Sequence, residues 1–148
     1  MPRQKWKWVV PLALVSAFLV LAKTMNSNPP TNRAQTLPDA SEADLQTRVY
    51  SAPLDEVAAK VRTQGRGLST YGRRWHIESE DVQPIIFRVP VIVFSDLLTV
   101  SLHSEGQDKT RVDVESHSLV GQGDFGENRR HVRQILRALD AVLPRAKS

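Results

Sequence analysis

The spacing of apolar positions predicts two helices within residues 45–148. In each segment apolar side chains recur three and four residues apart, as one buried face of a helix requires. Gly65 and Gly67 end the first run, and the second lies close to the C-terminus. The apolar positions are Leu54, Val57, Ala58 and Val61 in the first helix, and Val132, Ile135, Leu136, Leu139 and Leu143 in the second. Each helix therefore has one face to bury.

Between these helices the pattern changes to the period of two that is typical of β-strands. A polar loop over residues 104–108 favours a hairpin, and Pro90 indicates an edge position or a bulge. The expected strands cover residues 75–80, 85–94, 97–103 and 110–119, and a short strand over 47–50 precedes the first helix. This order predicts an α+β fold: a short strand and helix, about four antiparallel strands, and a long C-terminal helix packed on one sheet face.

The N-terminal residues predict a membrane segment. Arg3, Lys5 and Lys7 precede an uncharged run over residues 8–22, and a helix over residues 6–25 would be about 30 Å long, which matches a bilayer core. We expect a single transmembrane anchor within residues 1–25, with the positive cluster in the cytoplasm. A cleaved secretory signal peptide is the alternative. Both interpretations place the rest of the chain across the membrane.

Residues 26–44 are rich in Pro, Asn and Ser, a composition that predicts a linker before a domain over residues 45–148. The expected location is the inner (cytoplasmic) membrane, with a single pass and a periplasmic C-terminal domain. Secretion after signal cleavage is the alternative. The expected partners are the membrane, through the N-terminal helix, and an envelope protein or lipid.

The amino-acid composition excludes several kinds of functional site. The chain has no cysteine, which excludes disulfides, thiolate metal sites and a cysteine nucleophile. The net charge of +4 divides equally: residues 1–44 hold five Lys/Arg against three Asp/Glu, and residues 45–148 hold fifteen against thirteen. Half of the excess therefore lies beside the apolar segment, and the domain has no basic stripe interleaved with aromatics. We expect no nucleic-acid partner.

The glycine-rich segment over residues 121–126 matches the dinucleotide fingerprint in letters only. That motif requires a parallel strand feeding a helix, whereas here the preceding strand belongs to a hairpin. Asp124 and Glu127 have capping-box spacing, which favours Asp124 as the cap of the last helix. Neither a nucleotide nor any other cofactor is predicted.

Histidines and carboxylates alternate onto one face of the expected sheet. His76, His103 and His117 would share that face with Asp113 and Glu115. Such a face is typical of the solvated side of an antiparallel sheet, and a metal or acid/base site assembled in space is the alternative. No metal-ligand spacing occurs along the chain. In the last helix Arg130, Arg133 and Arg137 form a basic stripe, which indicates a solvated face or a contact with headgroups or a partner.

The C-terminal half resembles the family known as domain of unknown function 1499. The residues that carry the resemblance are Thr110, Arg111, Val112, Asp113, Val114, Ser116, His117, Ser118, Gly121, Asp124, Phe125, Gly126, Asn128, Arg130 and Val132. Glu115, Leu119 and His131 stand where the family often has arginine. The resemblance implies an exported or membrane-associated bacterial protein with relatives in plastids, and it brings no assigned reaction.

These observations favour a membrane-tethered, extracytoplasmic, non-catalytic module that binds a protein partner or a lipid surface. One alternative is a small-molecule or lipid-binding domain with a pocket between sheet and helix. The other is a hydrolase or metal-dependent enzyme that uses the polar sheet face. The candidate site residues, each expected to hold the strand–loop–helix junction together, are Arg111, Asp113, Ser116, Ser118, Asp124, Asn128 and Arg130.

Overall fold

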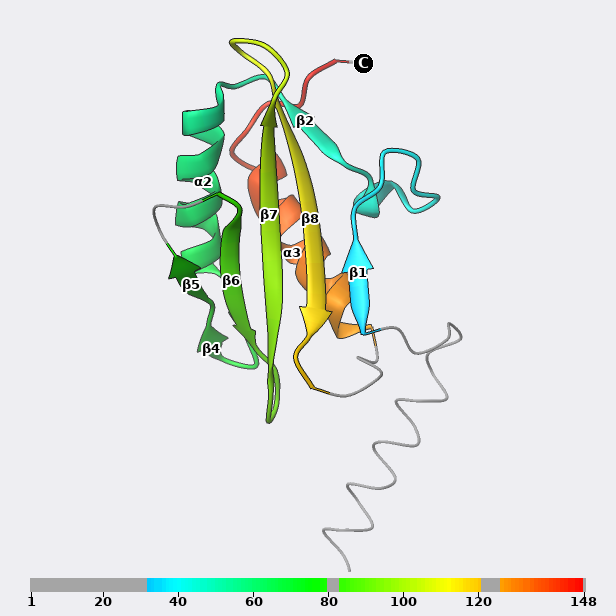
Figure 1. Cartoon of the computed structure of the whole chain (residues 1–148), viewed down its shortest axis with the longest axis vertical. Helices are drawn as coiled ribbons and strands as arrows, with labels where there is room; N and C mark the ends of the chain where they lie inside the picture. Colours follow the sequence, from blue (N-terminus) through cyan, green and yellow to red (C-terminus); the bar gives the residue numbers. More distant parts are fainter. Residues whose placement is uncertain (1–31, 80–82, 121–125, 148) are drawn as a thin grey trace, which may run out of the picture. The chain divides into compact units, whose positions relative to one another are not determined.

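The computed structural model describes residues 32–79, 83–120 and 126–147. Residues 31–148 form one compact unit (Figure 1). The expected membrane anchor and the glycine-rich segment with Asp124 lie outside the described residues. Within the described residues, neither helix is both long and apolar enough to cross a membrane.

An antiparallel sheet forms one layer of this unit, and its α+β class is confirmed (Figure 1). It has six strands, where about four were expected. Its order is β1-β8-β7-β6-β5, and β2 also pairs with β8. The bounds are β1 Arg33–Gln35, β2 Arg48–Tyr50, β5 His76–Ser79, β6 Ile85–Pro90, β7 Ser95–Ser104 and β8 Thr110–Ser118. Strand β8 is long enough to pair with β7 along one edge and with both short strands along the other.

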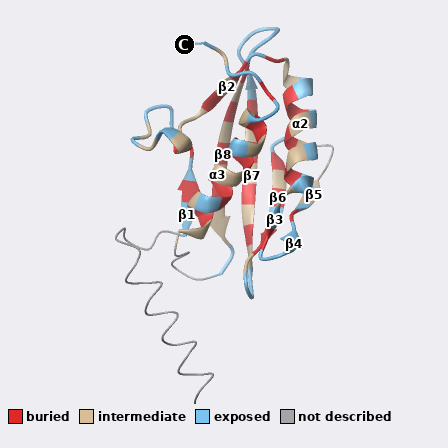
Figure 2. Ribbon diagram, turned by 180° about the vertical axis from the view of Figure 1, so that it is seen from behind, coloured by how far each residue is buried: buried red, intermediate tan, exposed pale blue. Residues whose placement is uncertain are grey.

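Both helices cover the same face of the sheet, as the sequence predicts. They are α2 Leu54–Gly67 and α3 Glu127–Asp140, and Figure 2 shows them in front of the strands. A short hairpin of β3 Ser69–Thr70 and β4 Arg73–Arg74 follows α2. A 3₁₀ turn, η1 Ala43–Leu45, packs near α3. Among the residues that the structure describes, no helix covers the opposite face of the sheet.

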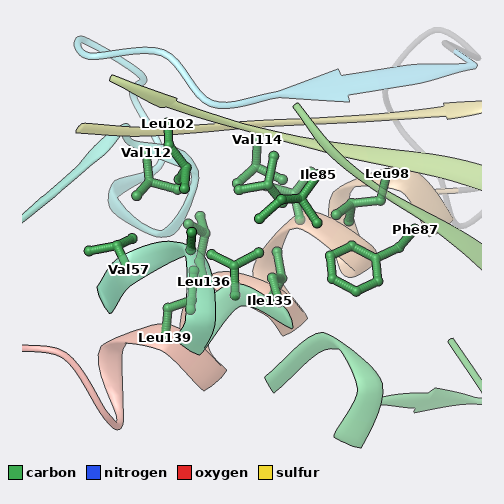
Figure 3. Packing of buried hydrophobic residues seen from close by; sticks show 14 of the residues in the cluster. Val57, Ile85, Phe87, Leu98, Leu102, Val112, Val114, Ile135, Leu136 and Leu139 are labelled. Atoms are coloured by element: carbon green, nitrogen blue, oxygen red, sulfur yellow. The ribbon is translucent and has the colours of Figure 1, made fainter. Parts of the chain in front are cut away.

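The core fills the space between the sheet and the two helices (Figure 3). Alternate residues of β7 and β8 point inward, including the fully buried Leu98, Val100 and Val112. Phe87 is also fully buried, and its ring lies 6.1 Å from that of Trp75. Gly65 lets the helix α2 backbone approach Phe87, because a Cβ there would lie 2.2 Å from the ring.

One boundary differs from expectation. The segment expected to be a linker contributes β1, and η1 is held to α3 by ion pairs such as Arg133–Asp44 at 2.7 Å. The polar composition of this segment suits ion pairing as well as solvation, so composition alone does not distinguish a linker from part of the domain. Helix α3 begins at Glu127, and its N-cap position is Gly126 in the left-handed region, φ 84°. Asp124 lies outside the described residues, so its expected capping role stays a prediction.

Candidate functional site

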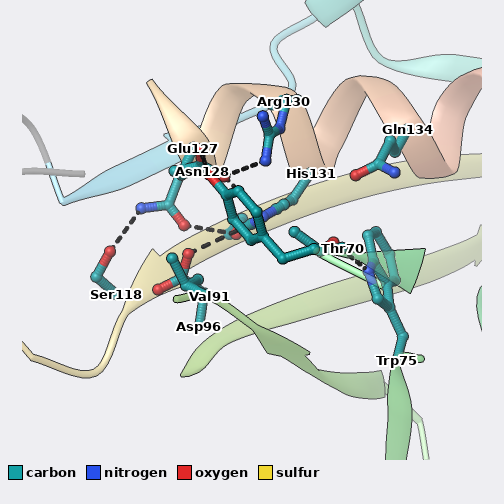
Figure 4. Close-up of polar contacts among 12 residues, drawn as sticks. Thr70, Trp75, Val91, Asp96, Ser118, Glu127, Asn128, Arg130, His131 and Gln134 are labelled. Carbon is teal, nitrogen blue, oxygen red and sulfur yellow. Dashed lines mark hydrogen bonds and ion pairs between the residues drawn. The ribbon is translucent and has the colours of Figure 1, made fainter. Parts of the chain in front are cut away.

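Asn128 ties three segments together at the start of helix α3. Its side chain is fully buried. The amide Nδ2 donates to the carbonyl oxygen of Asn32 at 2.9 Å and to Ser118 Oγ at 3.0 Å, the second of which is drawn in Figure 4. Its Oδ1 accepts from Ser116 Oγ at 2.6 Å. A fully buried amide needs such partners, because an unpaired polar group would be destabilising there.

The carbonyl of Asn32 receives a second donor. The backbone N–H of Ser118 donates to it at 2.8 Å. Asn32 immediately precedes β1, so this carbonyl marks the place where the chain from the N-terminus joins the domain. We call Asn32, Ser116, Ser118 and Asn128 the junction clamp. It fixes the first described residue to both the end of β8 and the first turn of α3.

One turn further along α3, His131 lies between two carboxylates. Its Nδ1 is 3.3 Å from Asp96 Oδ2, and its Nε2 is 3.4 Å from Glu127 Oε2. The His131 side chain is fully buried, and Asp96 is almost so. The ring of Trp75 packs edge-on against the imidazole, with centroids 6.0 Å apart. These contacts link the start of β7 to α3.

The two carboxylates favour a positive charge on His131. Burial lowers its pKa, but interactions with Asp96 and Glu127 outweigh burial and hold the pKa above its ordinary value. Burial likewise raises the pKa of Glu127, whereas the hydrogen-bonding contacts of His131 and Tyr71, with the charge of Arg130, bring it below its ordinary value. An imidazolium between two carboxylates is therefore the favoured arrangement.

An aromatic and a basic side chain form the solvent edge of this cluster. The Tyr71 hydroxyl donates to Glu127 Oε1 at 2.6 Å, and Arg130 Nη2 donates to Oε2 at 2.7 Å. The Arg130 guanidinium also lies over the Tyr71 ring, 5.1 Å from its centroid. The charges of His131 and Arg130 together balance those of Asp96 and Glu127.

The cluster of His131, Asp96 and Glu127 is suited to holding strand β7 against helix α3. General acid/base chemistry requires a group within hydrogen-bond reach of a substrate, and His131 is fully buried. Within the described residues, no group of three or more His, Asp or Glu side chains is arranged to hold a metal ion. The arrangement can connect secondary-structure elements and set their charge, but it offers a substrate no access to the imidazole.

The polar sheet face lies on the side without helices. Arg111 Nε donates to Asp113 Oδ2 at 3.1 Å, and Thr47 Oγ1 donates to Asp113 Oδ1 at 2.8 Å. His103 Nε2 is 3.6 Å from Asp113 Oδ2. A shallow depression of about 190 Å³ lies here, lined in part by Ser101 and Asp113. Both Asp113 oxygens already have partners.

The structure separates the sequence-predicted site residues. It brings Ser116, Ser118 and Asn128 together, and Arg130 lies close by through Glu127. Arg111 and Asp113 are on the opposite sheet face and do not reach the junction, and Asp124 lies outside the described residues.

The sequence reasoning missed the roles of His131 and Asp96. A signal was present for both. His131 falls four and eight residues before Ile135 and Leu139 on the apolar stripe, and Asp96 takes the inward phase of β7 with Leu98. A charged residue in a buried phase indicates a buried partner.

Comparison with known proteins confirms the family resemblance drawn from the C-terminal half. The family model described as Protein of unknown function (DUF1499) matches residues 20–139. This range includes the junction clamp and His131. No curated protein and no solved structure matches the chain. The chemistry of the site therefore rests on its own geometry.

Proposed function

The chain belongs to the DUF1499 family of proteins of unknown function, and on that premise we propose that it is a non-catalytic module tethered to the extracytoplasmic side of the inner membrane. The tether is the apolar N-terminal segment. The observation that carries this proposal is the junction clamp, which fastens Asn32 to β8 and α3. Because Asn32 is fixed to the domain, the reach of the tether is set by the residues that precede Asn32.

The family resemblance and the clamp coincide. Ser116, Ser118 and Asn128 are among the residues that carry the resemblance, and in the structure they contact one another and Asn32. Their geometry supports a structural role in joining the N-terminal segment to the domain. Strand β1 continues the attachment, because Thr36 Oγ1 accepts from the Val114 N–H at 2.9 Å.

The alternatives receive less support from the site. A hydrolase on the polar face would need a carboxylate within hydrogen-bond reach of a histidine. His103 Nε2 is 3.6 Å from Asp113 Oδ2, and His117 Nδ1 is 3.8 Å from Glu115 Oε1, so both distances exceed that reach. Ligand pockets usually enclose about 300–1,000 Å³. The depression beside Asp113 is smaller, at about 190 Å³. The interior between sheet and helices is occupied by fully buried side chains such as Phe87 and Ile135.

Extraction of membranes at alkaline pH tests the tether. The full chain should remain with bacterial inner membranes, and a version lacking residues 1–25 should be recovered in the soluble fraction. The intact mass of the membrane-bound protein should correspond to the uncleaved chain. Release of the full chain by alkaline carbonate, or a mass showing loss of the apolar segment, would overturn the proposal.

A further inference from the structure

Large apolar side chains are exposed at one end of the sheet. Of the eight exposed large hydrophobic residues among those the structure describes, five occupy two neighbouring segments. We call these five the apolar end. They are Ile92, Val93 and Phe94 between β6 and β7, and Leu119 and Val120 after β8. Val93 is the most exposed, at 74%. Exposed apolar clusters on a folded domain mark interaction surfaces.

Strand register brings these segments together. Asp96 of β7 pairs with Ser118 of β8, so the residues before Asp96 and those after Ser118 extend past the same sheet end. The carbonyl of Asn32 is bonded to the N–H of that same Ser118. The start of β1 therefore lies at the same end of the sheet as these segments (Figure 1).

The turn that presents Ile92, Val93 and Phe94 is held in shape by polar contacts. The Val91 N–H donates to the Phe94 carbonyl at 2.8 Å. The guanidinium of Arg73 donates to the carbonyls of Val91 and Ile92. Because its backbone is satisfied in this way, the turn presents its side chains to solvent in a preorganised form. Preorganisation reduces the entropy lost when such a surface binds.

The surroundings of the apolar end have the chemistry of a bilayer interface. Tyr71 is half exposed beside Arg130, and Arg73 is bonded to the turn itself. Tyrosine rings and arginine side chains favour the headgroup region, where apolar stems bury and charges remain hydrated. The nearby carboxylate of Glu127 is paired with Arg130 and His131, which removes repulsion from anionic headgroups.

Chain length limits how far this end can be from the membrane. Seven residue steps separate Met25, the end of the expected membrane helix, from Asn32. A fully extended chain covers about 25 Å over that number of residues. If residues 1–25 span the bilayer, the apolar end is held at high effective concentration near the lipid surface. A weak interfacial contact is then sufficient for stable docking.

We propose that the apolar end inserts into the interface of the same bilayer that the N-terminal segment spans. This inference rests on the proposed function and adds the orientation of the domain. The occupant of the apolar end is the lipid surface itself. Insertion places β8 with its Ser118 end toward the membrane and the β7–β8 hairpin away from it.

Fluorescence from single labelled cysteines tests the orientation. The chain has no native cysteine, so Val93→Cys carries a unique environment-sensitive probe. Glu105→Cys is the matched control, because it lies in the hairpin at the other end of β8, about 30 Å away. Both full-length variants are reconstituted into vesicles that contain anionic lipid and lipid-borne quenchers. Both changes are at exposed positions and preserve the core.

The expected result is blue-shifted emission and several-fold stronger quenching at position 93 than at position 105. Equal, water-like emission at both positions overturns the docking. Protection of position 93 in native membranes, but not in pure lipid vesicles, also overturns it and assigns the surface to a protein. Alkaline extraction of the same vesicles reports on the tether separately. Docking can therefore fail while the anchor holds, and the two failures are distinguishable.

Discussion

Replacing Asn128 by alanine should lower the free energy of unfolding by about 3 kcal/mol. The side chain makes three hydrogen bonds, and each contributes about 1 kcal/mol net. The substitution leaves the fully buried Ser116 hydroxyl without its acceptor, which adds to the loss. The Asn32 carbonyl still accepts from the Ser118 N–H, which limits the loss of unfolding free energy. For a domain of this size the corresponding fall in melting temperature is about 10–15 °C.

Urea denaturation of the Asn128→Ala variant measures this effect. Asn128→Asp is the informative companion, because it keeps an acceptor for Ser116 but replaces the amide nitrogen Nδ2, which supplies both N–H donors, with a carboxylate oxygen facing the Asn32 carbonyl. It should be at least as destabilising as alanine. Arg137→Ala is the control: its side chain is 75% exposed on the same helix, and the change should stay within about 0.5 kcal/mol.

A second readout is specific to the clamp. Loss of the clamp should free the start of β1 and expose the peptide bond after Arg33 to trypsin under native conditions. Wild-type unfolding free energy in Asn128→Ala, together with unchanged resistance at Arg33, would refute the reasoning.

Three further changes probe the packing and the buried charges. Because the pKa of His131 is raised in the folded state, protonated His131 stabilises the fold fully below about pH 6.5, and this stabilisation is lost as pH rises through the raised pKa. The free energy of unfolding should therefore fall across that pH range, and its dependence on pH should be weaker in His131→Gln. Gly65→Ala should destabilise by about 1–3 kcal/mol in urea denaturation, because the new methyl group meets the Phe87 ring. Asp140→Ala should lower the calorimetric unfolding free energy by about 2 kcal/mol, because the buried Tyr50 hydroxyl loses its acceptor at 2.8 Å.

Long periodic elements could be predicted from sequence. The helical spacing around Val57 and Val61 and the stripe from Val132 to Leu139 appear as α2 and α3. Alternation predicted β8 to within one residue at its C-terminal end. These segments are long enough for their period to reveal which side is buried, and both helices bury the side that the period indicates.

Short elements could not be predicted in the same way. Strand β1 has only three residues, which is too few to show a period, and it lies in a polar stretch. Its stability comes from pairing with β8, some 80 positions away, and from the junction clamp. The expected strand over 85–94 ends at Pro90, because the chain then turns through Val91–Phe94. That turn is also the exposed part of the apolar end.

The site residues predicted from the sequence lie on two opposite faces of the sheet for a physical reason. Ser116 has the inward phase of β8, whereas Arg111 and Asp113 have the outward phase, so strand geometry alone places them on opposite faces. Family resemblance grouped them by sequence proximity. The ion cluster of His131, Asp96 and Glu127 depends on tertiary packing between β7 and α3. The buried phases of His131 and Asp96 indicate that each has a buried partner, but they do not indicate which residue it is.

Labelling of cysteines in intact cells tests the central claim most directly. Full-length Glu105→Cys and Val93→Cys chains are treated with a maleimide that crosses the outer envelope but not the inner membrane. The account predicts rapid labelling at position 105, protection at position 93, and labelling of both after detergent. Labelling of neither position until the inner membrane is opened would place the domain in the cytoplasm. Equal labelling of both in intact cells would leave the apolar end in water, and either result contradicts the account.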